Sequence, residues 1–203
     1  KRHAMFKVAR YLKIGAIGLL PSAAMAVDLT LLAGLQANGD FEDTATGENI
    51  GVQDGAAFAV ALDFPLNGSP TERLGLYLGH QATRFASDAQ LSDRDLGITH
   101  LHFTAMSLWP NGRWEPFLLL GLGVAYFSPD DSTLDADTFV SGQIAGGTSL
   151  KVTERFLLRF GARWLPTFFD GGGAVFCNGS CTIAVKSQVW SQGLVDVGLQ
   201  FRF

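Results

Sequence analysis

The stretch Val195-Asp-Val-Gly-Leu-Gln-Phe-Arg-Phe203 alternates between two kinds of side chain. One set comprises Val195, Val197, Leu199, Phe201 and Phe203, and the other comprises Asp196, Gly198, Gln200 and Arg202. Because successive side chains of a β-strand point to opposite faces, this pattern predicts a strand with one apolar and one polar face. The charged residues share their face with a glycine, and this association proves decisive for the fold.

Seven further stretches show a similar alternation and are separated by turn residues. Together they predict eight strands, at about 27–37, 55–64, 73–85, 96–109, 114–127, 139–152, 155–168 and 182–203. Short connectors at 65–72, 110–113 and 153–154 alternate with mostly longer, polar connectors at 38–54, 86–95, 128–138 and 169–181. This alternation is typical of an antiparallel up-and-down β-barrel.

The association of charge with small residues indicates which face of the strands lies inside. In the strand at 114–127, Glu115 lies on the same face as Gly121, Gly123 and Ala125, and leucines occupy the other face. A soluble, lipocalin-like barrel would put the leucines inside, and a membrane barrel would put them outside. An eight-stranded barrel has room inside only for side chains or one small ligand, so the small residues belong there. The sequence therefore predicts an all-β, eight-stranded transmembrane β-barrel.

Aromatic residues gather near the expected strand ends. Trp109 and Trp114 bracket one short turn, and Phe64 and Phe203 lie at other short-turn ends. The long-loop ends carry Phe85, Tyr126, Phe127, Phe139, Phe168 and Phe169. Because membrane barrels carry an aromatic girdle at each interface, we expect two girdles here.

Residues 1–26 have the three parts of a secretory signal peptide: a basic start, an apolar run at 14–20, and the small-residue site Ala24-Met25-Ala26. The alternative is a short membrane anchor, but the run is much shorter than the ~20 apolar residues of a span. We therefore expect a leader at 1–26 and one barrel domain at 27–203.

The charge balance of the barrel domain argues against nucleic acid as a partner. Five of the 15 basic residues and none of the 19 acidic ones lie in the expected leader, which leaves a net charge of about −9. Phosphate backbones are bound by clusters of lysine and arginine, which this domain lacks.

Two cysteines, Cys177 and Cys181, are four residues apart. Export to an oxidising compartment predicts a disulfide between them, and zinc is the weaker alternative because no histidine is near. His100 and His102 share one strand face, but no third metal ligand is identifiable. We therefore predict neither a metal nor a cofactor.

Three stretches, Ile98–Phe103, Pro116–Phe127 and Cys177–Val185, resemble the porin-like family of small eight-stranded outer-membrane β-barrels of Gram-negative proteobacteria. The resemblance covers essentially all of 27–203 and implies insertion in the outer membrane, among lipid and lipopolysaccharide. Phe201 and Phe203 resemble the carboxy-terminal signal read by the barrel-assembly machinery. The family implies no shared catalytic residue.

Nine charged residues are expected on the inner face: Asp28, Asp63, Arg73, Glu115, Lys151, Arg159, Arg163, Asp196 and Arg202. Unpaired charge would be costly in a narrow lumen, so we expect these groups to pair. They would form either a structural plug or a gated, narrow ion path.

Three functions remain open from the sequence. The first is a structural or surface-interaction role, with possible partners at loops 38–54, 128–138 and 169–181, whose carboxylates could also bind divalent cations. The second is a narrow pore or transporter for small or apolar solutes, which could leave sideways through the wall. The third is a lipid-modifying enzyme, although His80, near the outer rim, has no serine and orienting acid recognisable beside it.

Overall fold

A computed structural model of the chain describes residues 27–42, 49–85, 95–130, 135–169, 174–175, 183–184 and 189–203. The expected leader at 1–26 and the expected Cys177–Cys181 disulfide lie outside these residues, as do parts of the long loops. In the described part of the chain, no helix has the length and apolar character needed to cross a membrane.

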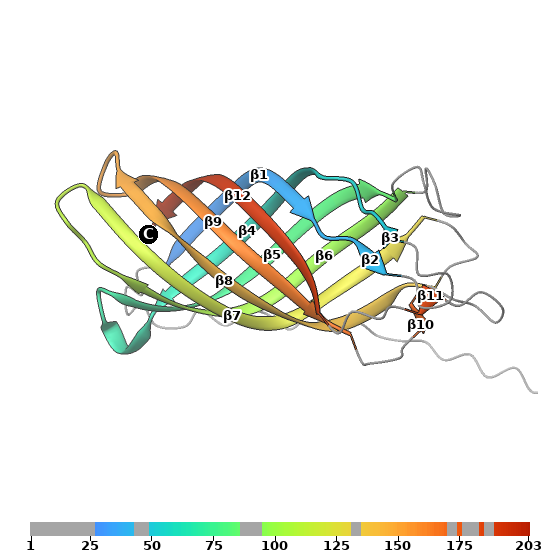
Figure 1. Cartoon of the computed structure of the whole chain (residues 1–203). Coiled ribbons are helices and arrows are strands. Elements are labelled where there is room, and N and C mark those ends of the chain that lie inside the picture. Colours follow the sequence, from blue (N-terminus) through green and yellow to red (C-terminus); the bar gives the residue numbers. More distant parts are fainter. Residues whose placement is uncertain are drawn as a thin grey trace, which may run out of the picture.

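Eight antiparallel strands close into a barrel in the order β1-β12-β9-β8-β7-β6-β5-β4 (Figure 1). Their bounds are β1 (Asp28–Asn38), β4 (Gly55–Pro65), β5 (Glu72–Arg84), β6 (Asp95–Leu108), β7 (Trp114–Pro129), β8 (Asp137–Lys151), β9 (Phe156–Phe168) and β12 (Val189–Arg202). The first of these pairs along its whole length with the last, from Asp28 opposite Arg202 to Asn38 opposite Gln192. Closure joins the first barrel strand to the last, so the barrel itself has no free edge strand, as a sheet in lipid requires.

The barrel confirms the predicted fold, and seven expected strands match the observed bounds to within two residues. The last expected strand began too early. β12 begins at Val189, which pairs with the final residue of β9, Phe168. Instead, β11 (Ile183–Ala184) pairs with β10 (Ala174–Val175), and β2 (Phe41–Glu42) pairs with β3 (Asn49–Ile50). These two small sheets lie at the long-loop end (Figure 1).

Tight turns join the strands at the opposite end of the barrel. The turn after β4 contains a 3-10 helix, η1 (Leu66–Gly68), in which Asn67 and Gly68 have φ of 49° and 73°. The turn between β6 and β7 has Gly112 at φ 62°. A positive φ is easily adopted by glycine and tolerated by asparagine, so these residues permit the abrupt reversals.

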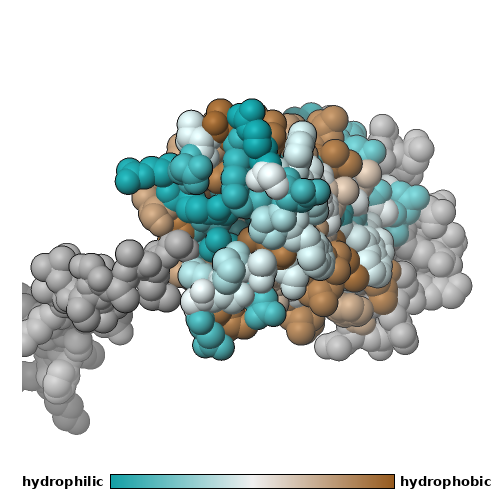
Figure 2. Space-filling model, turned by 90° about the vertical axis from the view of Figure 1, so that its left-hand side faces the viewer, coloured by the Kyte–Doolittle hydropathy of each residue, from teal (hydrophilic) through white to brown (hydrophobic). Residues whose placement is uncertain are grey.

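The outer wall is apolar and the inner face largely polar, as the alternation predicts. Phe103, Leu122 and Val195 are 72%, 71% and 67% exposed, whereas Asp28 and Arg159 are 0% and 2% exposed. A contiguous exposed apolar surface of this extent is typical of a membrane-spanning wall. The barrel strands have 11 to 16 residues, enough to cross a bilayer at a tilt. Viewed onto the short-turn end, hydrophilic side chains gather over the mouth and hydrophobic ones along the flanks (Figure 2).

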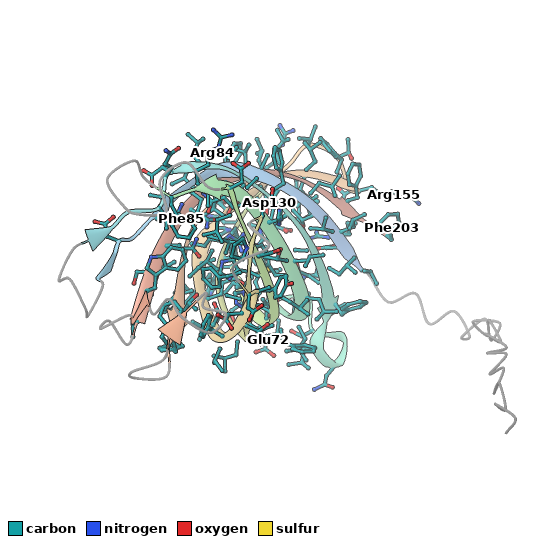
Figure 3. The ribbon with its side chains drawn as sticks, turned by 90° about the vertical axis from the view of Figure 1, so that its right-hand side faces the viewer. Glu72, Arg84, Phe85, Asp130, Arg155 and Phe203 are labelled. Atoms are coloured by element: carbon teal, nitrogen blue, oxygen red, sulfur yellow. The ribbon has the colours of Figure 1, made fainter. Side chains whose placement is uncertain are left out.

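The predicted aromatic girdles are correct in part. Trp109, Trp114 and Phe203 are exposed at the short-turn end, and Tyr126 and Phe168 are exposed at the long-loop end. The prediction is wrong for four residues: Phe85, Phe127 and Phe169 are buried inside the barrel, and Phe139 packs against them from the inward face of β8. Their position in the strand alternation decides this: Phe127 shares its face with inward-pointing Ala125, whereas Tyr126 points outward. Phe85 likewise points inward while neighbouring Arg84 points away (Figure 3).

Candidate functional site: the barrel lumen

The lumen holds all nine charged residues expected there, and each takes part in an ion pair. They come from β1, β4, β5, β7, β8, β9 and β12. Three layers follow one another along the barrel axis: a charged network at the short-turn end, a polar middle, and an aromatic cluster at the long-loop end.

Arg202 is the centre of the charged network. From β12, its Nε lies 3.0 Å from Asp28 Oδ1 on neighbouring β1, and its Nη2 lies 3.0 Å from Glu115 Oε2 on β7. Because β9 and β8 lie between β12 and β7, the second contact bridges the barrel. Lys151 Nζ approaches Glu115 Oε1 at 2.9 Å, and Arg73 Nε approaches Asp28 Oδ2 at 3.6 Å. Five strands are thereby tied together at this mouth.

Arg159 extends the network deeper into the lumen. Its Nη1 lies 3.4 Å from Asp63 Oδ2, and both side chains are almost fully buried. The guanidinium also lies 4.0 Å above the centroid of the Phe117 ring. A cation over an aromatic face is stabilised by the ring quadrupole, and more strongly when it is desolvated. Arg159 thus has an ionic and an aromatic partner, which together offset part of its burial cost.

The polar middle is organised around another buried ion pair. Arg163 Nε lies 2.8 Å from Asp196 Oδ2, and the guanidinium stacks over Tyr77 at 4.5 Å. His100 and His102 lie in the same region, with ring centroids 5.4 Å apart.

Each histidine has an amide partner on another strand. His100 Nε2 is 2.8 Å from Gln192 Oε1, and His102 Nδ1 is 3.0 Å from Gln143 Oε1. Among the described residues, no three His, Cys, Asp or Glu side chains form a group that could hold a metal ion. The two histidines act here as hydrogen-bonding lumen groups.

The long-loop end of the lumen is filled by aromatic and aliphatic side chains. The cluster, here called the aromatic cap, contains Val52, Phe85, Leu96, Ile98, Ala125, Phe127, Phe169 and Trp190, with Phe139 packed against it. Ring centroids lie 5.4 Å apart for Phe127 and Trp190, and 4.6 Å for Phe139 and Phe169. Sequence reasoning missed this cap, although strict counting along the strand at 114–127 would have turned Phe127 inward.

One seam of the barrel wall is incomplete below the cap. The ladder between β8 and β9 runs through Ser141 opposite Thr167 and resumes at Ile144 opposite Trp164. The skipped segment contains Pro166, which has no backbone N–H to donate. On the outside, an apolar groove of about 650 Å³ includes Gly142, Pro166 and Phe168. This stretch is here called the β8–β9 seam.

The remaining predicted residues lie outside the lumen. Phe201 points outward and its ring lies 5.5 Å from that of Phe156, while the backbone N of Phe203 donates to Val27 O at 3.0 Å. His80 faces outward, and its Nδ1 lies 2.9 Å from Thr99 Oγ1.

Comparison with known proteins supports the fold and goes no further. No family model matches the sequence, and no curated protein sequence is similar to it. The structure is similar to that of Neisserial surface protein A, with 15% identity, a TM-score of 0.61, and coverage of 88% of this chain and 97% of that one.

Two further outer-membrane proteins are similar at comparable identity. OprG from Pseudomonas aeruginosa has 12% identity and a TM-score of 0.55, covering 88% of this chain and 97% of that one. AlkL, solved in lipid bilayers, has 14% identity and a TM-score of 0.51, and the match covers 100% of this chain and 96% of that one. The fold itself decides neither for nor against catalysis. With its apolar wall and polar lumen, the chain is a closed eight-stranded β-barrel with the fold of these outer-membrane proteins.

Proposed function

We propose that this barrel has a structural or surface-interaction role, in which the lumen is a plug rather than a path. The observation that carries this proposal is the charged network at the short-turn mouth. Arg202 bridges Asp28 and Glu115 across the barrel, and Arg159 binds Asp63 one layer deeper. An ion would have to displace these contacts and then pass the aromatic cap. The residues of the cap carry no charge that could replace the ion's hydration shell.

The loops would then provide the function, since the barrel holds them at the cell surface. At the long-loop end, the acidic residues that the structure describes include Asp40, Asp54 and Asp130. Surface loops on a rigid scaffold commonly carry binding residues. The barrel interior would supply stability and rigidity.

Planar-bilayer recording tests the plug. We expect the purified barrel to give no steady conductance in molar KCl, and Glu115→Gln, which weakens the network, to give brief openings. Glu72→Gln is the matched control, because Glu72 is exposed at the same end of the barrel. A steady current through the unaltered protein would overturn the proposal, since a paired plug cannot conduct continuously.

A second candidate function rests on the β8–β9 seam: passage of apolar compounds from the aromatic cap sideways into the membrane. The cap would receive the compound at the loop end, and the seam would release it. In the seam, Gly142 is three residues from Phe139 along β8, and Pro166 is three residues before Phe169, which directly follows β9. Its outer side opens on an apolar groove. Backbone pairing is what closes a barrel wall, so a wall opens most easily where the ladder is interrupted.

A disulfide staple tests this candidate. Gly142→Cys with Pro166→Cys would lock the seam, and Gly146→Cys with Ala162→Cys would lock an intact pair on the same strands. Both pairs would be placed in a chain with Cys177 and Cys181 replaced by serine. We expect only the seam staple to slow uptake of N-phenyl-1-naphthylamine into proteoliposomes, with recovery on reduction. Equal uptake by both oxidised variants would contradict lateral release.

A further inference from the structure

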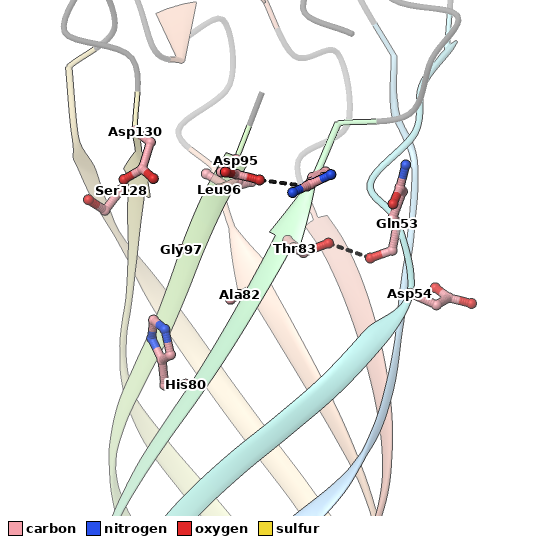
Figure 4. A pocket seen from close by; sticks show the side chains of 11 residues that line it. Gln53, Asp54, His80, Ala82, Thr83, Asp95, Leu96, Gly97, Ser128 and Asp130 are labelled. Atoms are coloured by element: carbon pink, nitrogen blue, oxygen red, sulfur yellow. Dashed lines mark hydrogen bonds and ion pairs between the residues drawn. The ribbon is translucent and has the colours of Figure 1, made fainter. Parts of the chain in front are cut away.

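The apolar outer wall is hollowed on one side by a polar trench near the long-loop end (Figure 4). The trench has a volume of about 720 Å³ and lies on β5, β6 and β7, beside the residues that precede β4. It belongs mainly to the outer wall, because His80, Ala82 and Arg84 all point outward from β5.

Strand register arranges the trench in three rows. The middle row is Ala82 opposite Gly97 and Gly97 opposite Ser128. These three side chains are small, so they form a sunken floor. Above the floor, toward the loops, Arg84 lies opposite Asp95; below it, His80 lies opposite Thr99 and Thr99 opposite Tyr126.

The upper lip is rich in carboxylates. Arg84 Nε lies 2.6 Å from Asp95 Oδ1, so the arginine is already engaged. Asp130 lines the same side of the trench, which gives this lip two carboxylates against one guanidinium. Asp54 lines the far side of the trench, where its Oδ1 accepts from the backbone N of Asn38. A phosphate here would meet a surplus of negative charge, whereas hydroxyl groups could donate hydrogen bonds to the same oxygens.

The lower lip adds polar groups directed at the floor. His80 Nδ1 lies 2.9 Å from Thr99 Oγ1, which fixes the ring. A Cβ on Gly97 would stand 3.5 Å from His80 Cε1, so this edge of the imidazole overhangs the floor. The trench can therefore hydrogen-bond a ligand from both lips.

Immediately below the trench, toward the bilayer centre, the outward side chains of the wall are aliphatic. The next outward row is Leu78 opposite Leu101 and Leu101 opposite Val124, which are 51%, 45% and 37% exposed. Charged, small, polar and then aliphatic rows thus follow one another from the loops toward the bilayer centre. This order matches an amphiphile whose head lies at the interface and whose chains run down the wall.

We propose that the trench binds the saccharide headgroup of an outer-leaflet glycolipid. Sugar hydroxyls would donate to Asp95 and Asp130 and contact His80, while the acyl chains would cover Leu78 and Leu101. The small floor supplies the depth that a sugar ring needs. This proposal requires the membrane orientation of the barrel but not a closed lumen, so it can fail independently of the plug.

Native mass spectrometry of the barrel released from nanodiscs tests the trench. The probes are monogalactosyl diacylglycerol and a phosphatidic acid with the same acyl chains, supplied at equal amounts. We expect the galactolipid to be retained in preference to the phosphatidic acid. Gly97→Leu fills the floor and should reduce galactolipid retention by about tenfold, equivalent to 1.4 kcal/mol.

Ala162→Leu is the matched control, because Ala162 points outward from β9 on the opposite wall. It should leave retention unchanged. Asp130→Asn removes an acceptor charge without adding bulk, and should also lower galactolipid retention even if Gly97→Leu fails to fold. Equal retention of both lipids by the unaltered protein, or no loss in Asp130→Asn, would overturn the proposal and indicate ordinary annular lipid.

Discussion

At the short-turn end of the lumen, Arg202 and Arg159 hold carboxylates from strands across the barrel, whereas at the loop end the rings of Phe127 and Trp190 pack against each other. The two ends therefore fill the same narrow space by different physics. Ion pairs need particular atoms at particular distances, and an ion left alone in a buried site is heavily penalised. Aromatic packing needs only volume and shape, so it tolerates rearrangement. We expect the charged end to specify the closed barrel and the aromatic end to be adaptable.

The largest expected effect comes from removing the deepest cation. Arg159→Ala leaves Asp63 without its pair and removes the contact with Phe117, so we expect a loss of about 3–5 kcal/mol in the free energy of unfolding. Urea denaturation in detergent, followed by the gel shift of the folded barrel, measures it. Arg155→Ala is the control, because Arg155 is exposed in the adjoining turn. Equal losses in the two variants would show that pairing at Asp63 does not stabilise the barrel.

A smaller loss in the free energy of unfolding should follow a substitution in the charged network at the short-turn mouth. Glu115→Ala removes one partner of Arg202, but Arg202 keeps Asp28 and Lys151 is already 30% exposed. We therefore expect a loss of about 1–3 kcal/mol, measured by the same gel shift and compared with Glu72→Ala. A loss as large as that of Arg159→Ala would mean that the mouth and the deeper pair act as one cooperative unit.

The smallest effect is expected in the aromatic cap. Phe127→Leu keeps an apolar side chain of similar volume, so unfolding should become easier by only about 1 kcal/mol. Tyr126→Leu, on the lipid side of the same strand, is the companion variant for the same denaturation assay. If Phe127→Leu cost as much as Arg159→Ala, the cap would be as strictly specified as the charged end, and the contrast between the two ends would disappear.

Much of the barrel could be predicted because strand alternation is a local property. The face shared by Glu115, Gly121 and Gly123 is set by backbone geometry alone, and lumen volume then decides which face is inner. Seven strand bounds followed from turn residues in the same way. The last strand was mispredicted because its start depends on where β9 ends, which residues 182–188 do not encode locally.

Side-chain partners were harder to anticipate than side-chain directions. The nine inward charges could be named from the alternation along each strand. The choice of Glu115 as a partner of Arg202 could not, because the two residues are 87 positions apart in the chain. The aromatic cap was missed because the position of Phe85, Phe127, Phe139 and Phe169 near strand ends was given more weight than the strand face on which each lies. The trench was invisible for a different reason: Ala82, Gly97 and Ser128 are unremarkable until register aligns them.

By itself, the sequence determined the number of strands, the orientation of their two faces and the enclosure of charge within a small barrel. These follow from a two-residue period and from the limited space inside eight strands. Only the tertiary structure decided which cation meets which carboxylate, where the wall is unpaired and where small residues hollow its surface. Those features depend on register between strands, and register arises only when distant segments are brought side by side.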